Sequence, residues 1–92
     1  MDKEKIYRKV IGKYGIAAQL DMVIEEMSEL TKEICKIKRG KGKYMNIVEE
    51  IADVEIMLDQ LKMICQIRVN DLHGMKFQKL ERLKEVLEYD SH

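Results

Sequence analysis

The chain has 92 residues, balances 17 Lys and Arg against 17 Asp and Glu, and contains no Pro. This length is typical of one domain, so residues 1–92 are expected to form a single helical domain. The zero net charge argues against a general nucleic-acid-binding protein. Because no apolar run reaches membrane-spanning length and no signal peptide opens the chain, we expect a cytoplasmic protein that does not enter the membrane.

Four amphipathic segments follow one another, and their apolar spacing predicts helices over 2–14, 16–38, 44–67 and 71–89. Gly15 is expected to end the first helix, and Asn70 to be the N-cap of the fourth. The pattern predicts an all-α fold, a four-helix-type bundle built from antiparallel helices. Since so small a domain buries little apolar surface, we expect oligomerisation, as a homodimer or homotetramer, to complete the bundle.

Apolar residues recur at steps of three and four in the second and third helices, a seam that packs on other helices. The seam positions are Leu20, Val23, Met27, Leu30, Ile34 and Ile37, then Ile47, Ile51, Val54, Leu58, Leu61 and Cys65. In the fourth helix we expect Leu72, Met75, Leu80, Leu83 and Leu87 to point inward. Cys35 and Cys65 lack a metal-ligand spacing and are predicted to be reduced, buried thiols.

An acidic pair spaced by three residues flanks each seam: Glu26 with Glu29, and Glu50 with Asp53. This spacing places both carboxylates of a pair on one helix face, where like charges repel. In an antiparallel hairpin turning near Gly40, the two pairs should meet at one level. A hard divalent cation, most simply Mg²⁺, would relieve the repulsion.

One such acidic string is more often a solvated helix face, but two strings at similar distances from the turn favour a metal site. A di-iron centre is the poorer interpretation, because neither His73 nor His92 belongs to a Glu-x-x-His motif. Both histidines are expected at the surface. The turn 39–43 carries two glycines among cations; it could approach a phosphate, but a solvated connection is favoured because no P-loop pattern is present.

Three cations, Lys76, Lys79 and Arg82, form a stripe on the fourth helix. Lys79 and Arg82 each precede a seam residue, so they could reach the acidic cleft and hold phosphate oxygens. A basic solvent face that merely borders the core is an equally good interpretation.

The order of these motifs resembles the MazG-like all-α nucleoside triphosphate pyrophosphohydrolases over residues 16–87. The matching strings are EEMSE at 25–29, EEIADV at 49–54 and KLER at 79–82. The resemblance implies a dimeric or tetrameric helical enzyme with Mg²⁺, or alternatively Mn²⁺, held by Glu26, Glu29, Glu50 and Asp53. It implies hydrolysis of a (d)NTP between the α and β phosphates, which gives a monophosphate and pyrophosphate.

Other residues have expected roles in such a reaction. Lys79 and Arg82 would offset charge on the leaving pyrophosphate, with Lys76 beside them. Glu25 or Glu49 would orient or deprotonate the attacking water, unless both are simply solvated. Substrate contacts are expected from Gln19, Asn46 and Tyr14, the last by stacking on the base.

The family often holds the base with aromatic side chains, whereas this chain has no Trp, one Phe and four Tyr. The base is therefore left open, and a phosphoribosyl-ATP pyrophosphohydrolase-like enzyme is one alternative. Another is a non-catalytic helical interaction module whose acidic face docks a basic partner. A third is a relative that binds nucleotide without turnover. The enzyme requires its carboxylates and a divalent ion, whereas the interaction module should tolerate single losses and ignore Mg²⁺.

Overall fold

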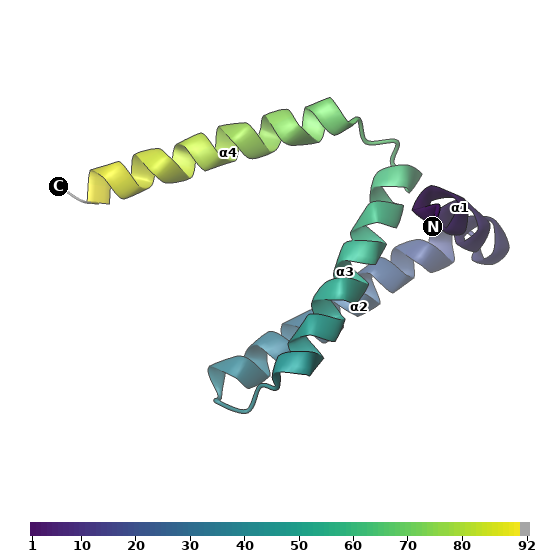
Figure 1. Ribbon diagram of the computed structural model, residues 1–92, viewed down its shortest axis with the longest axis horizontal. Helices are drawn as coiled ribbons and strands as arrows, with labels where there is room; N and C mark the ends of the chain where they lie inside the picture. The colour runs from purple at the N-terminus through teal and green to yellow at the C-terminus, as the bar shows by residue number, and fades with distance from the viewer. Residues whose placement is uncertain (91–92) are drawn as a thin grey trace.

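The computed structural model describes residues 1–90, which form four α-helices joined by short connections (Figure 1). The helices are α1 (Lys3–Tyr14), α2 (Ile16–Lys38), α3 (Tyr44–Ile64) and α4 (Val69–Asp90). The long helices α2 and α3 pack as an antiparallel hairpin. Helix α1 lies beside the open end of this hairpin, and α4 extends away from it (Figure 1). The all-α prediction is therefore confirmed, and within residues 1–90 no helix is long and apolar enough to span a membrane.

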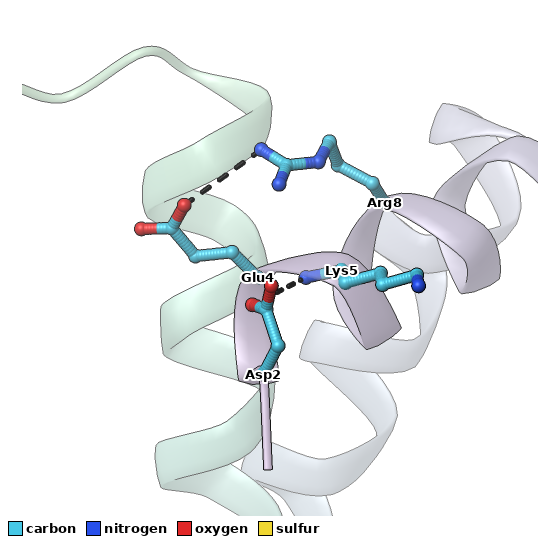
Figure 2. Close-up of polar contacts among 4 residues, drawn as sticks. All are labelled: Asp2, Glu4, Lys5 and Arg8. Carbon is cyan, nitrogen blue, oxygen red and sulfur yellow. Dashed lines mark hydrogen bonds and ion pairs between the residues drawn. The ribbon is translucent and has the colours of Figure 1, made fainter.

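Helix α1 begins at Lys3, one residue later than predicted, because Asp2 is its N-cap. The backbone N–H of Lys5 donates to Asp2 Oδ1 at 3.1 Å, and Glu4 pairs with Arg8 at 3.7 Å one turn along (Figure 2). Gly15 then ends α1: its φ is 91°, and its N–H donates to the carbonyl of Ile11 at 2.8 Å. A side-chain-bearing residue would be strained at this φ, which explains why the first two helices separate here.

The connection between α2 and α3 is a tight turn that depends on glycine. Gly40 has a φ of 72°, and the N–H of Lys41 donates to the carbonyl of Lys36 at 2.9 Å, which closes α2 with a Schellman motif. At Gly42 a Cβ atom would lie 2.5 Å from Ile37 Cγ1. Both glycines are thus accounted for by the turn itself.

The end of α3 differs from the prediction. The helix stops at Ile64 rather than 67, because Gln66 adopts a φ of 54° and the N–H of Ile67 donates to the carbonyl of Lys62 at 2.9 Å. This is again a Schellman motif, but with Gln where glycine is usual. Helix α4 then begins at Val69, so Asn70 lies in its first turn and the prediction that it is the N-cap is wrong.

The most buried apolar side chains are Tyr7, Val23, Val54 and Met57. The predicted seam is only partly covered: Met27 is 50% exposed and Ile51 is 44% exposed. The reason is geometric, since α2 and α3 meet along the acidic flank of the seam rather than along its centre. The middle of the seam consequently lies on one open face of the hairpin.

Helix α4 leaves most of its apolar side chains open, contrary to the prediction that they point inward; Leu72 is partly buried and lines a hollow with Leu58 and Leu61 of α3. None of the residues in Val69–Asp90 is buried, and Leu80 and Leu83 are 63% and 60% exposed. The extension of α4 away from the hairpin explains this (Figure 1). Cys35 and Cys65 are exposed too, so the prediction of buried thiols is wrong. His73 is exposed as expected, while His92 lies outside the described residues.

One hydrogen bond ties α1 to the hairpin: the Tyr7 hydroxyl donates to Asp59 Oδ2 at 3.1 Å. Burial, with the hydrogen bond to Asp59 and its charge, raises the pKa of Tyr7. We expect Tyr7→Phe to lower the free energy of unfolding by about 1–2 kcal/mol, because Asp59 loses a donor. Urea denaturation measures this, with the exposed Tyr14→Phe as control. An equal effect of both variants would contradict the role given to this bond.

Candidate metal centre

Three carboxylates gather where α2 and α3 face each other. One carboxylate oxygen from each of Glu26, Glu50 and Asp53 lies within 4.8 Å of the other two. Glu26 comes from α2 and the other two residues from α3, so the hairpin unites side chains that are distant in sequence. Three of the four predicted metal ligands are thus brought together. The fourth, Glu29, is exposed and is not part of this group.

The register of the hairpin accounts for this meeting. Glu26 lies 14 residues before Gly40 and Asp53 lies 13 residues after it, so these two come to one level on antiparallel helices, with Glu50 one turn nearer the bend. Glu26, Glu50 and Asp53 are each partly buried, whereas Glu25, Glu29 and Glu49 are exposed around them. By helix geometry all six point to the same side of the hairpin, which we call the acidic face. The open part of the seam lies on the opposite side.

The carboxylates are electrostatically unfavourable as they stand. Burial raises the pKa of Glu26, and the charges of Asp53, Glu50, Glu25 and Glu29 raise it further. Burial likewise raises the pKa of Glu50, followed by the charges of Asp53, Glu29, Glu49 and Glu33. Within the described residues, Glu50 Oε2 is shielded from solvent and has no hydrogen-bond partner. A shielded acceptor without a donor is costly, which indicates that a cation or donor belongs here.

A hard divalent cation fits this donor set. Three carboxylates supply oxygen ligands and negative charge, as Mg²⁺ and Mn²⁺ require. Opposite oxygens in an octahedral Mg²⁺ shell lie about 4.2 Å apart. Neighbouring oxygens in such a shell lie about 3.0 Å apart, so the three oxygens, which lie within 4.8 Å of one another, would draw closer together around an ion. No such fit exists for zinc of the structural type, because histidine and cysteine do not take part in this group.

The predicted phosphate-binding cations lie elsewhere in the chain. Lys76, Lys79 and Arg82 are exposed on α4, where Lys79 and Arg82 line a shallow hollow of about 370 Å³ together with Met75 and Gln78. Because α4 extends away from the hairpin, the fold of one chain does not bring these cations to the carboxylates (Figure 1).

The predicted substrate-binding residues flank the carboxylates on both sides. Gln19 is buried, and with Tyr14 it lines a largely apolar hollow of about 520 Å³ between α1 and α2. This hollow lies about 10 Å from Glu26 along α2. Asn46 is exposed at the start of α3, toward the turn. Gln19 and Asn46 are therefore on opposite sides of the three carboxylates.

Two polar features of the hairpin were not assigned from the sequence. Gln60 is only 4% exposed, and its Oε1 atom has no hydrogen-bond partner in the described part of the chain. Glu33 is buried and pairs with Lys36 at 3.1 Å. Gln60 lies three residues after Met57, and Glu33 lies three residues after Leu30. This helical spacing was the available signal for their burial. Lys36, a cation of α2, is therefore engaged in an ion pair with Glu33.

The raised pKa of Glu26 predicts an unusual pH dependence in the metal-free protein. A carboxyl whose pKa is raised by folding destabilises the fold above that pKa, and has no effect below its ordinary pKa. We therefore expect Glu26→Gln to increase the free energy of unfolding at neutral pH, with the gain disappearing near pH 4. Urea denaturation in EDTA at both pH values tests this, with the exposed Glu55→Gln as control. A gain that persists unchanged at low pH would contradict the electrostatic account.

Comparison of the chain with models of known protein families, with curated proteins and with solved structures gives no match. A functional proposal for this chain therefore depends on its residues and their geometry. The feature that it must explain is the group of Glu26, Glu50 and Asp53, which combines partial burial, mutual repulsion and an unpartnered acceptor atom.

Proposed function

We propose that this chain is a Mg²⁺-dependent nucleotide pyrophosphohydrolase of the MazG-like type. In this proposal it cleaves a (d)NTP between the α and β phosphates, and water adds to give a monophosphate and pyrophosphate. The observation that carries the proposal is the carboxylate group of Glu26, Glu50 and Asp53 on two antiparallel helices. The ordered strings EExxE and EEIADV, which supply these three residues, support the same interpretation.

The three carboxylates would hold the cation, and Mn²⁺ could replace Mg²⁺. When bound, such an ion neutralises phosphate charge and makes a coordinated water more acidic. Glu29 stands at the exposed rim of the group, where it could complete the ligand set. Glu25 and Glu49 are adjacent, exposed carboxylates, and either could orient the attacking water and accept its proton.

The nucleoside would extend from the carboxylates toward α1. The hollow lined by Tyr14, Gln19 and Met22 is mostly apolar and lies about 10 Å from Glu26 along the helix axis. That separation suits a nucleoside whose phosphates bind at the carboxylates. Tyr14 could stack on the base, while the Gln19 amide could bond its edge. Asn46, on the turn side of the carboxylates, would contact the far end of the triphosphate rather than the base.

The proposed enzyme is a homodimer or homotetramer. Two apolar surfaces of the single chain support this: the open seam around Met27 and Ile51, and the apolar side of α4 around Leu83. Each would be covered by another copy, which would complete a helical bundle. The surfaces lie on different elements, so a dimer could use one of them and a tetramer both.

The proposal is tested by measuring product formation from a panel of ribo- and deoxyribonucleoside triphosphates, with Mg²⁺ and with EDTA. The expected result is monophosphate and pyrophosphate in equal amounts, formed with Mg²⁺ and not with EDTA. Diphosphate and phosphate as products would contradict cleavage between the α and β phosphates. If a folded oligomer leaves the whole panel intact, phosphoribosyl-ATP is the next substrate to test.

The exposed apolar residues of α4 favour a second candidate, a non-catalytic helical interaction module. Met75, Leu80 and Leu83 form a surface that a partner helix could cover. In that case the acidic face would dock a basic partner, and Mg²⁺ would compete with the partner rather than support turnover. A partner complex that forms equally well with Glu50→Gln, in a protein without hydrolytic activity, would favour this candidate.

A further inference from the structure

We propose that Lys79 and Arg82 act in trans. In this arrangement α4 of a second copy of the chain lies across the acidic face of the α2–α3 hairpin and brings both cations to Glu26, Glu50 and Asp53. The role of the cations in hydrolysis rests on the proposed function, but the contact between copies does not.

Helix α4 cannot reach the carboxylates of its own chain (Figure 1). It begins at Val69, beyond the open end of the hairpin, and extends away from it (Figure 1). The carboxylates lie near the middle of α2 and α3, several turns closer to the Gly40 turn. Lys79 and Arg82 could meet these carboxylates only if they came from another chain.

The single chain also leaves a large surface uncovered. The exposed area is 7874 Å², roughly 2,300 Å² more than a compact monomer of this mass would expose. The radius of gyration is 16.9 Å, against about 12 Å for a compact chain of this length. A stable interface needs about 800 Å² from each partner, so the excess area is ample for a second copy.

Lys79 lies within an apolar stripe of α4. Leu72, Met75, Lys79, Leu83 and Val86 follow one another at steps of three and four and therefore share one side of the helix. Covering this stripe would bury the stem of Lys79 and would require an anionic partner for its ammonium group. Arg82 lies one turn further, beside the same stripe.

The acidic face supplies the matching charges. Glu25, Glu29 and Glu49 are exposed around the three partly buried carboxylates, and Glu50 Oε2 has no hydrogen-bond partner within the described residues. Helix α4 is about 33 Å long and α2 about 35 Å, so one can lie along the other. Lys84 lies on the other side of α4 from Lys79, about 140° around the helix, and serves as an internal control.

The contact is tested first without reference to activity. Equal amounts of ¹⁴N- and ¹⁵N-labelled full-length chain are mixed, and a carbodiimide joins neighbouring lysine and carboxylate groups. We expect cross-linked peptides that pair a light with a heavy chain and join Lys79 to Glu25, Glu29 or Glu49. Lys84 should give none of these links. The proposal is overturned if the chain is monomeric by light scattering, or if these links form only within one chain or not at all.

The role in the reaction is tested by mixing two inactive variants, Glu50→Gln and Arg82→Ala. If Arg82 acts in trans, a site is intact when its own chain retains Glu50 and its partner retains Arg82, so random mixing restores about a quarter of wild-type activity. If Arg82 acts within its own chain, every site stays defective and mixing restores nothing, which overturns the trans assignment. Lys84→Ala should keep the wild-type rate.

The two experiments separate the failure of this inference from that of the proposed function. If light–heavy links form at Lys79 but the protein has no hydrolytic activity, the contact between copies is supported and the proposed enzymatic function is contradicted. If hydrolysis is metal-dependent but no such links form and mixing restores no activity, the enzymatic function is supported and the contact between copies is contradicted.

Discussion

Replacing Glu50 with Gln is expected to abolish pyrophosphate release while the chain remains folded. Glu50 is the carboxylate whose Oε2 atom is shielded and has no partner within the described residues, so it is the ligand most dependent on a cation. Loss of an outer-shell partner of a metal typically costs 10–100-fold, so loss of a ligand should lower kcat/KM by more than about 100-fold. The control is Glu55→Gln, which removes the same charge from an exposed position on α3.

The same substitution is expected to leave the metal-free protein at least as stable at neutral pH. Burial and neighbouring charges raise the pKa of Glu50, so its charged form opposes folding at pH values above that pKa. A neutral amide removes this opposition. Circular dichroism and urea denaturation in EDTA measure the effect. Retained turnover in the folded variant would remove Glu50 from the metal site, and a failure to fold would contradict the electrostatic account.

Replacing Arg82 with Ala is expected to lower kcat/KM by about 100-fold while metal affinity stays unchanged. Loss of one donor to a developing negative charge typically costs this much. Arg82 belongs to α4, which extends away from Glu26, Glu50 and Asp53 of its own chain (Figure 1). Steady-state kinetics and Mn²⁺ titration of the same preparation measure the two quantities, with Lys84→Ala as control. Equal losses of turnover and metal affinity would mean that Arg82 acts on the fold or on the metal instead.

The helix boundaries were predictable where glycine marks them. Both ends of α2 are as predicted, because Gly15 and Gly40 adopt backbone angles that favour glycine. The end of α3 was not predictable in this way, since Gln66 occupies a left-handed position without a glycine to signal it. The start of α4 followed from that error: the earlier end of α3 leaves room for α4 to begin at Val69.

The meeting of the three carboxylates was largely predictable because it depends on local geometry. A spacing of three residues and an antiparallel turn are sufficient to bring Glu26, Glu50 and Asp53 together. Glu29 shows the limit of this reasoning, because it is exposed one turn along α2 and outside the group. Periodicity shows which residues share a side of a helix, but not how far each side chain lies from the helix that it faces.

The packing of the seam and of α4 could not be predicted from periodicity. Apolar spacing identified the seam, but α2 and α3 meet along its acidic flank, which buries Glu33 and leaves Ile34 exposed. For α4, spacing predicted a buried side without naming the surface that covers it. In the single chain most of this side stays exposed, because the other three helices do not cover it.

The most direct test of the central claim is a titration of the metal-free protein with Mn²⁺, followed by electron paramagnetic resonance. If Glu26, Glu50 and Asp53 hold a divalent cation, the wild-type chain and Glu55→Gln will bind Mn²⁺ saturably, and Mg²⁺ will displace it. Glu50→Gln will lose this binding. Equal binding by all three proteins, or none by the wild type, would contradict the metal site and the function built on it.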